Sequence, residues 1–451
     1  MRARFLSLLI ACAFAPGALL AQSAPAAPVA QDAQDAQDAP AASDDPDAVE
    51  LAGAKVPLEE IRRFVTVYNA VRQAYVDPVD DHKLMQAAVQ GLLLDLDPHS
   101  AYLEKTDAED FDEQTRGSYD GVGVELQQLP DGALRVIAPL DDSPAERAGL
   151  RSGDRIIAID GKPLLAGQGD ASTPLRGKAG SKVVVKVVRE GVRAPFELTL
   201  LRDTIRAASV RARMLEPGFG YVRISSFQAP TAADFVKQLD ALQKDAPLRG
   251  LVLDLRSNPG GLLIGAVQIA DELLPSGNIV STRGRESIGN SRYDATPGDR
   301  LHGAPLVVLV DAGSASAAEV LAGALHDNQR ARVVGSRTFG KGSVQTLLPL
   351  DNGDSVKLTT ARYYTPSGHS IQALGIVPDE VLHPEGDARK PAPISEAELP
   401  GHLAAESGAQ EGDNAGEVLP GTKPVDAALL VLKRMAGGVQ PAGKPAAGKA
   451  Q

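Results

Sequence analysis

The chain has 451 residues, 43% of them hydrophobic and 23% charged, so it is long enough to form two or three domains with sizeable cores. Its formal net charge is -12 at pH 7, and no basic block stands out along it, which argues against a protein that binds nucleic acid by neutralising phosphates. We therefore expect a protein or a small molecule as the substrate, and no nucleic-acid partner.

The N-terminus has the pattern of a secretory signal peptide. Arg2 and Arg4 precede an apolar run that is too short to span a bilayer comfortably, and the small residue Ala21 follows it. Cleavage after Ala21 would make residues 1–21 the signal and would remove Cys12, the one cysteine of the chain. We therefore expect a periplasmic protein without a disulfide.

A second interpretation of the N-terminus is a lipid anchor. The run from Leu9 to Cys12 reads Leu-Ile-Ala-Cys and resembles a lipoprotein cleavage box, which would leave a lipid-modified Cys12. A lipid anchor or an uncleaved signal would associate the protein with the membrane. Export from a bacterial cytoplasm is expected with either interpretation.

The next segments differ sharply in composition. Residues 22–50 are rich in Ala, Gln, Asp and Pro and contain no Lys or Arg, which is typical of a disordered acidic linker. From Leu51 onward, residues 61–76 and 83–96 space their apolar side chains at helical intervals, with a break at Asp77-Pro78. We therefore expect an N-terminal helical region over residues 51–116.

Residues 117–204 have the pattern of a small domain made mostly of short strands. The turn Pro130-Asp131-Gly132 separates two of these strands, and two small helices interrupt the series. This pattern predicts a self-contained module with one small, barrel-like sheet and two helices. The expected strands are 121–128, 133–140, 155–160, 181–188 and 196–201, and the expected helices are 143–150 and 171–178.

Strand and helix patterns alternate over residues 205–384, which predicts an α/β core with a largely parallel sheet. The expected strands are 221–227, 251–258, 306–311 and 331–335, and the expected helices are 232–243, 317–326 and one that begins at Leu262. Residues 385–451 are rich in Pro, Gly, Ala and Glu. We expect them to form a flexible tail with one short amphipathic helix near residues 425–436.

The segment from Gly335 to Gln345 resembles a phosphate-binding loop but lacks two of its features. Four residues separate Gly335 from Gly340-Lys341, but Gly342 stands where Ser or Thr would coordinate magnesium. A phosphate-binding loop also opens a helix, whereas strand patterns follow this segment. Nucleotide binding remains an alternative function, which the absence of thermal stabilisation by nucleotides would exclude. We expect no metal, nucleotide or other cofactor.

Ser316 is a candidate nucleophile. The apolar strand 306–311 runs into Gly313-Ser314-Ala315-Ser316, and a helix begins at once. A serine on such a turn has an accessible hydroxyl, and the helix N-terminus favours developing negative charge. Ser316 and Glu319 also fit a capping box, and for this stretch alone a cap is the more frequent explanation.

A serine nucleophile needs a base, and Lys341 is a better candidate than His326. His326, with Asp327 beside it, comes a helix later, about 15 Å from Ser316. Lys341 follows the next strand, and neighbouring parallel strands bring their carboxyl-end loops together. As a base it must be neutral, so burial must lower its pKa from about 10.4 toward 7 or 8, a cost of roughly 4 kcal/mol. Gln345 is placed to hold the amine.

A third strand ends in Asp-Leu-Arg-Ser-Asn-Pro-Gly-Gly, residues 254–261. Gly260 and Gly261 allow a backbone N–H group to face a substrate carbonyl oxygen and to form an oxyanion hole with the N–H of Ala317. Taken alone, this segment is an ordinary strand-to-helix turn. Together, the three strand ends supply a nucleophile, a base and oxyanion donors.

The chain resembles the carboxyl-terminal processing proteases, which are serine endopeptidases with a PDZ domain and a Ser-Lys dyad. The resemblance implies that Ser316 is the nucleophile, that Lys341 is the general base and that Gln345 orients the lysine. Relatives often have Ser at the position of Ala318, and Asp327 matches a position that matters in relatives, where we expect structural support. The matching motifs are LDPHSAYL (96–103), GVGVEL (121–126), SPAERAGLRSGDRIIAIDG (143–161), DLRSNPGG (254–261), GSASAAEVLAGALHD (313–327) and FGKGSVQ (339–345).

The segment Gly121-Val122-Gly123-Val124 is the expected peptide-binding loop of the PDZ domain. Its backbone N–H groups can bind a terminal carboxylate, and an exposed strand edge beside it can pair with a substrate strand. The resemblance implies an exported endopeptidase that captures apolar protein C-termini and cleaves nearby through an acyl-enzyme. It also suggests self-association into a homo-oligomer and an adaptor lipoprotein as a partner. A non-catalytic PDZ scaffold is the alternative.

The expected fold class is therefore multidomain α+β. It comprises an N-terminal helical segment, a PDZ domain over residues 117–204, an α/β protease core of crotonase-like type over residues 205–384, and disordered termini.

Overall fold

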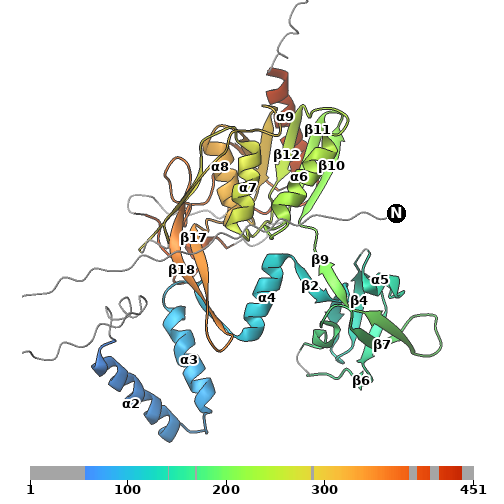
Figure 1. Cartoon of the computed structure of the whole chain (residues 1–451), viewed down its shortest axis with the longest axis vertical. Coiled ribbons are helices and arrows are strands. Elements are labelled where there is room, and N and C mark those ends of the chain that lie inside the picture. The colour runs from blue at the N-terminus through green and yellow to red at the C-terminus, as the bar shows by residue number, and fades with distance from the viewer. Residues whose placement is uncertain are drawn as a thin grey trace, which may run out of the picture. The chain divides into compact units, whose positions relative to one another are not determined.

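The computed structural model describes residues 56–140, 142–167, 170–285, 289–384, 394–406 and 416–438. The expected signal peptide, the acidic linker and Cys12 lie outside these residues. The chain divides into two units, Met1–Val79 and Asp80–Gln451, whose elements are drawn in Figure 1. Among the described residues, no helix has the length and apolar character needed to cross a membrane.

The N-terminal region is helical, as predicted. Helix α2 (Leu58–Ala74) belongs to the first unit, and helix α3 (Asp81–Leu94) opens the second. The side chain of Asp80 caps α3 by accepting a hydrogen bond from the Lys83 N–H at 3.1 Å. A third helix, α4 (Lys105–Arg116), ends at Gly117, whose φ of 69° is the left-handed conformation that glycine supplies at a helix end.

The predicted PDZ region forms one antiparallel sheet in the order β3-β4-β5-β7-β8, with β6 paired to β5. Four of its expected strands are confirmed, whereas the expected strand 121–128 is divided: Gly121 ends β2, which pairs with β9, and the strand of this sheet begins at Val124. Thirteen of its apolar side chains form a buried cluster of their own. Strand β2 pairs with β9, so the segments that enter and leave the module are joined. The elements are β2 (Ser118–Gly121), β3 (Val124–Gln128), β4 (Leu134–Pro139), α5 (Pro144–Arg147), β5 (Arg155–Ile159), β6 (Lys162–Pro163), the 3-10 helix η2 (Thr173–Leu175), β7 (Lys182–Val188), β8 (Phe196–Leu201) and β9 (Asp203–Arg206).

The predicted protease core contains a six-stranded sheet in the order β10-β11-β12-β15-β16-β19. Strand β10 is antiparallel to β11 and every other pair is parallel, so the predicted, largely parallel sheet is confirmed. The elements are β10 (Val210–Glu216), β11 (Phe219–Ile224), α6 (Thr231–Leu242), β12 (Gly250–Asp254), α7 (Leu263–Leu273), β15 (Leu306–Val310), α8 (Ala317–Asp327), β16 (Arg332–Gly335) and β19 (Glu380–Val381).

Alternate side chains of these strands belong to two different apolar clusters. Leu251 and Val308 pack with helices α6, α7 and α8, whereas Val252 and Val307 pack with helix α9 (Lys423–Gly438). Because side chains alternate across a strand, α9 covers the face opposite to the other three helices (Figure 1).

The structure differs here from the flexible tail expected for residues 385–451. Helix α9 includes the expected residues 425–436 and buries its apolar stripe on the sheet, and the 3-10 helix η4 (Glu396–Glu398) precedes it. Composition alone missed these contacts because the sheet face that receives α9 is built from distant strands. The apolar side chains of α9 are therefore buried against the sheet of the same chain.

A second, antiparallel sheet has the order β1-β18-β13-β14, with β17 also paired to β18. Strand β1 belongs to the N-terminal region, and its pairing with β18 places the segment from Asp97 to Ser100 beside the protease core. We predicted the strands after Lys341 but not this pairing. The strands are β1 (Ala101–Leu103), β13 (Asn278–Gly284), β14 (Ser291–Asp294), β17 (Ser343–Pro349) and β18 (Ser355–Tyr364).

Candidate active site

The three predicted strand ends are neighbours in the structure. Strand β15 lies between β12 and β16, and all three are parallel, with Asp254 paired to Leu309 and Val310 paired to Gly335. The loops after these strands carry Gly260, Ser316 and Lys341, so they leave the sheet at one edge. The topology thus brings the three segments together as predicted.

Ser316 stands at the turn between β15 and α8 in an unusual backbone conformation. It is the N-cap of α8, with φ 53° and ψ -116°, a region that non-glycine residues rarely adopt. Ser314 stabilises the turn, since its Oγ donates to the Leu255 carbonyl at 2.8 Å and accepts from the Asp311 N–H at 2.9 Å. The Ala315 N–H donates to the Asn258 carbonyl at 2.9 Å. The segments that follow β12 and β15 therefore hold the serine.

Glu319 connects the serine turn to the lysine loop. Its buried carboxylate accepts hydrogen bonds from the N–H groups of Ser316 at 2.7 Å, Gly340 at 2.7 Å and Lys341 at 2.9 Å, and from the Thr338 hydroxyl. Burial raises the pKa of Glu319 to about 7, against the opposing effect of these donors. The predicted pairing of Ser316 with Glu319 is present, and the same carboxylate ties Ser316 to the candidate base.

The surroundings of Lys341 favour its neutral form. Burial lowers the pKa of Lys341 below its ordinary value, and the ammonium of Lys357 lowers it further. The carboxylates of Glu396, Asp97 and Glu319 oppose this shift. Within the described part of the chain, the Lys341 side chain makes no hydrogen bond or ion pair. The direction of the shift is the one that a lysine base requires.

Gln345 lies near the lysine loop on β17 but is bonded elsewhere. Its Nε2 donates to the Ser343 hydroxyl at 2.9 Å and to the Thr359 hydroxyl at 3.3 Å. The described residues contain no hydrogen bond between Gln345 and Lys341, so the orienting role of Gln345 stays a prediction.

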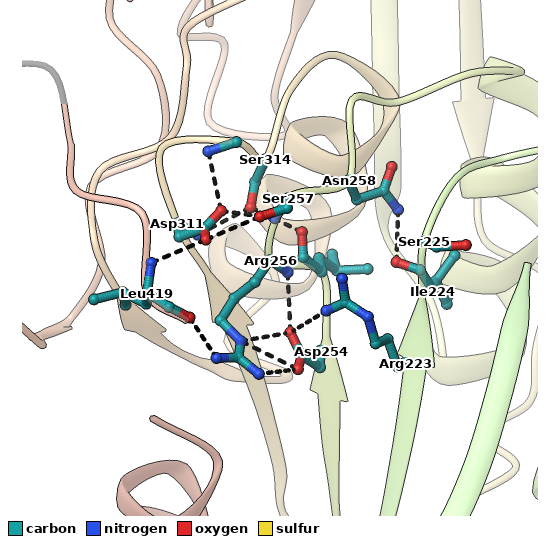
Figure 2. Close-up of polar contacts among 12 residues, drawn as sticks. Arg223, Ile224, Ser225, Asp254, Arg256, Ser257, Asn258, Asp311, Ser314 and Leu419 are labelled. Atoms are coloured by element: carbon teal, nitrogen blue, oxygen red, sulfur yellow. Dashed lines mark hydrogen bonds and ion pairs between the residues drawn. The ribbon is translucent and has the colours of Figure 1, made fainter. Parts of the chain in front are cut away.

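Of the three proposed oxyanion donors, one is already bonded. The Gly260 N–H donates to the Asn258 Oδ1 at 2.9 Å, and the Asn258 Nδ2 donates to the Ile224 carbonyl, as Figure 2 shows for the amide. Gly261 and Ala317 remain candidates, and Ala317 opens α8, where the first N–H groups have no partner within the helix. A Cβ at Gly260 would lie 2.9 Å from the Ser316 Cβ, so this glycine permits the close approach.

A buried ionic network anchors the base of these loops (Figure 2). The Asp254 carboxylate pairs with Arg256 at 2.7 Å and with Arg223 at 3.3 Å. Arg256 also donates to the Leu419 carbonyl, and the Leu419 N–H donates to Asp311 at 3.2 Å. The segment that leads into α9 is therefore bonded to the ends of β12 and β15.

Sequence reasoning missed Tyr363, which lies beside the serine. This buried tyrosine lies on β18, and burial raises its pKa to about 12 while the nearby Ser316 side chain acts in the opposite direction. The phenol is thus a neutral neighbour of the candidate nucleophile. Tyr363 was visible only as one of two adjacent aromatic residues in a strand, and nothing in that pattern shows which of them faces Ser316.

His326 lies at the other end of α8 from Ser316, as the helix length predicted. Its Nδ1 lies 2.9 Å from the Asp327 carboxylate and its Nε2 lies 3.5 Å from Asp379. Asp327 also accepts hydrogen bonds from the N–H and hydroxyl of Ser367, which agrees with structural support. The described residues contain no group of three or more His, Cys, Asp or Glu side chains arranged to hold a metal ion.

The predicted peptide-binding loop of the PDZ module borders a cavity of about 200 Å³. Val122, Gly123 and Val124 line one side of it. Gly121 ends strand β2 beside them. The remaining lining residues are Tyr119, Leu126, Ser172, Leu175 and Arg176. The loop therefore contributes mostly apolar side chains to a cavity that also has polar groups.

Comparison with known proteins agrees with this architecture. Residues 218–382 match the model of peptidase family S41, residues 135–189 match that of the PDZ domain, and residues 20–107 match that of the N-terminal domain of the activating protease CtpB. The PDZ match falls inside the module that the strand pattern predicted.

Curated relatives extend the similarity over most of the chain. A carboxy-terminal-processing protease of Bartonella bacilliformis is 40% identical over 80% of this chain and 85% of the relative. Carboxyl-terminal-processing proteases of Synechocystis and Picosynechococcus are each 39% identical, over 69% and 71% of this chain and 74% and 83% of the relatives. The chain therefore belongs to the carboxyl-terminal processing serine proteases of peptidase family S41, with a PDZ domain and an N-terminal domain like that of CtpB.

Proposed function

We propose that this protease cleaves proteins near their C-termini through an acyl-enzyme on Ser316, with Lys341 as the general base. The observation that carries the proposal is the Glu319 carboxylate, which accepts from the backbone of both Ser316 and Lys341. The buried Glu319 carboxylate thus fixes the position of the Ser316 turn relative to the Lys341 loop. The pKa of Lys341 is lowered by burial, which supports the same role.

The proposed reaction has two steps. The neutral Lys341 amine takes the proton of the Ser316 hydroxyl as Oγ attacks the substrate carbonyl carbon, and the resulting ammonium donates a proton to the leaving amine. A water molecule, deprotonated by the same amine, then attacks the ester carbonyl carbon, and the ammonium returns this proton to the Ser316 Oγ as the ester bond breaks. The N–H groups of Gly261 and Ala317 are the proposed donors to the oxyanion, and Gln345 is proposed to orient Lys341 during the reaction.

We propose further that the PDZ module selects substrates by their apolar C-termini. The cavity beside Gly123 supports this, because a peptide strand can add to a sheet edge there and place its last side chain among Val122, Val124 and Leu126. Five further proposals rest on the sequence alone. They are export to the periplasm, anchoring by a lipid or an uncleaved signal, self-association, binding to an adaptor lipoprotein, and the crotonase-like type of the core.

The test compares wild type with Ser316→Ala and Lys341→Ala, using a fluorophosphonate that acylates active serines and a loosely folded substrate with an apolar C-terminus. We expect wild type alone to be labelled and to cleave, with at least a 1000-fold loss in each variant, because nucleophile and base act as a unit. Lys433→Ala is the matched control, since Lys433 is an exposed lysine paired with Glu216 on the surface.

Three results would contradict the proposal. Labelling that survives Ser316→Ala would place the nucleophile elsewhere, and full activity of Lys341→Ala would assign the base to another residue. If wild type binds the C-terminal peptide but is neither labelled nor active, the non-catalytic scaffold is the correct interpretation.

A further inference from the structure

A segment of the tail contacts the loop that carries Lys341. Residues 394–406 lie beyond the S41 match, which ends at residue 382, and they contain the short helix η4. The Glu396 N–H donates to the Phe339 carbonyl at 3.0 Å, two residues before Lys341. This part of the tail is therefore bonded to the proposed active site.

Gln372 forms a second bridge between the tail and the same loop. Its buried side chain accepts a hydrogen bond from the Gly342 N–H at 3.0 Å through Oε1. Through Nε2 it donates to the Glu396 carboxylate at 2.8 Å and to the Leu403 carbonyl at 2.9 Å. The peptide groups on both sides of Lys341 are therefore held by side chains. Glu319 accepts a hydrogen bond from the Lys341 N–H, and Gln372 accepts one from the Gly342 N–H.

Glu396 has a fully buried side chain. Its carboxylate lies 2.8 Å from the Nε2 of His99 and accepts from Gln372, as described above. His99 belongs to the segment before β1, and its own N–H donates to the Asp97 carboxylate at 2.8 Å. Segments from both ends of the chain therefore meet beside the lysine loop.

We propose that Glu396 is a positioning residue for the general base, which it holds through Gln372 and the backbone of residues 339–342 while presenting a negative charge to the Lys341 amine. This inference rests on the proposed role of Lys341. It makes residues 394–406 part of the active site, although they lie outside the matched protease family region.

The charge of Glu396 should change the pH dependence of the reaction in one direction. Four charged groups from four elements act electrostatically on Lys341: Lys357 from β18, Glu319 from α8, Asp97 from the segment before β1, and Glu396 from η4. A carboxylate favours the ammonium form, so Glu396 raises the pH at which the neutral amine becomes available. Removal of this charge should shift the acidic limb of the pH–rate profile to lower pH.

The experiment measures the rate of fluorophosphonate acylation of the full chain between pH 6 and pH 10. For Glu396→Gln we expect the acidic limb to move about one pH unit lower, so that well below the limb the rate relative to its maximum rises about tenfold. The matched control is Glu398→Gln on the same turn, whose carboxylate accepts from Ser395 and is not among the charged groups that act on Lys341. Its limb should coincide with that of wild type.

If Glu396 had a purely structural role, Glu396→Gln would change the maximum acylation rate and leave the acidic limb of the pH–rate profile in place. That result would overturn the inference. Glu396→Asp supplies a second test that does not depend on the folding of the first variant. It retains the charge but shortens the side chain by one methylene, so the limb should stay while the maximum rate falls at least fivefold. An unchanged maximum rate would overturn the positioning role. Unlabelled wild type, or label that survives Ser316→Ala, would instead refute the proposed function.

Discussion

At the scale of single residues, the site depends on a serine in a strained conformation. A positive φ at a non-glycine residue costs about 1–3 kcal/mol and persists only where the surroundings determine it. For Ser316 those surroundings are the hydrogen bond from its N–H to Glu319 and the contacts of Ser314 and Ala315 with neighbouring strand ends. Hydrogen bonds from several segments of the site therefore maintain the strained backbone of Ser316.

Glu319 provides the sharpest prediction at this scale. In Glu319→Gln, an amide NH2 would face N–H groups that now donate to the carboxylate, leaving at least one buried donor without an acceptor. We expect at least a tenfold lower acylation rate and a loss of about 2 kcal/mol in the free energy of unfolding, measured by urea denaturation. Glu272→Gln, a partly exposed carboxylate on α7, is the control. A change of less than twofold in rate would show that the carboxylate is not needed.

At the scale of elements, helix α9 completes the core from outside the family match. The sheet exposes an apolar face made by alternate residues of β11, β12, β15 and β16, and α9 covers it with one stripe of its own. Lys433 and Arg434 of α9 form surface ion pairs with Glu216 and Glu380, and such pairs contribute little to stability. Apolar burial therefore holds the helix in place.

Two leucines of α9 test this assignment. Leu432 is fully buried against the sheet, where it lies over Gly250, whereas Leu430 is 63% exposed. We expect Leu432→Ala to lower the free energy of unfolding by about 2–5 kcal/mol, and Leu430→Ala to change it by less than about 0.5 kcal/mol. Urea denaturation of both variants measures the difference. Equal effects would mean that α9 does not dock as described.

At the scale of the whole molecule, the PDZ module and the protease core have separate apolar interiors. The buried cluster of the module contains residues of β4, β5, β7 and β8, and none of its members belongs to the clusters of the protease core. Because each interior is closed on itself, we expect the two parts to unfold in separate transitions.

Neighbouring leucines on β8 test this independence. Leu200 is fully buried in the module and Leu201 is 53% exposed. In calorimetry, Leu200→Ala should lower the midpoint of the PDZ transition by more than about 8 °C, since a loss of about 2 kcal/mol or more is expected in a domain of this size, and it should leave the protease transition in place. Leu201→Ala should move neither. A common shift of both transitions with Leu200→Ala would show that the parts unfold together.

Local patterns were enough to predict much of the fold and part of the site. Alternating strands and helices gave the parallel sheet, and the turns after three strands gave Gly260, Ser316 and Lys341 as neighbours. The sequence could not show that the Gly260 N–H is bonded to Asn258, that Gln345 is bonded to Thr359, or that Tyr363 lies beside Ser316. These contacts depend on side-chain directions that no local pattern determines.

The sequence by itself therefore determined the order of the elements, the family and the candidate nucleophile and base, because periodicity and motifs are local properties of the chain. Only the tertiary structure decided which distant residues surround them. Asp97 comes near Lys341 because β1 pairs with β18, and α9 lies on the sheet because its apolar stripe is buried there. Glu396 comes from the tail and reaches the lysine loop through Phe339 and Gln372. Such contacts arise from the packing of the whole chain, which leaves no signature in any one stretch of it.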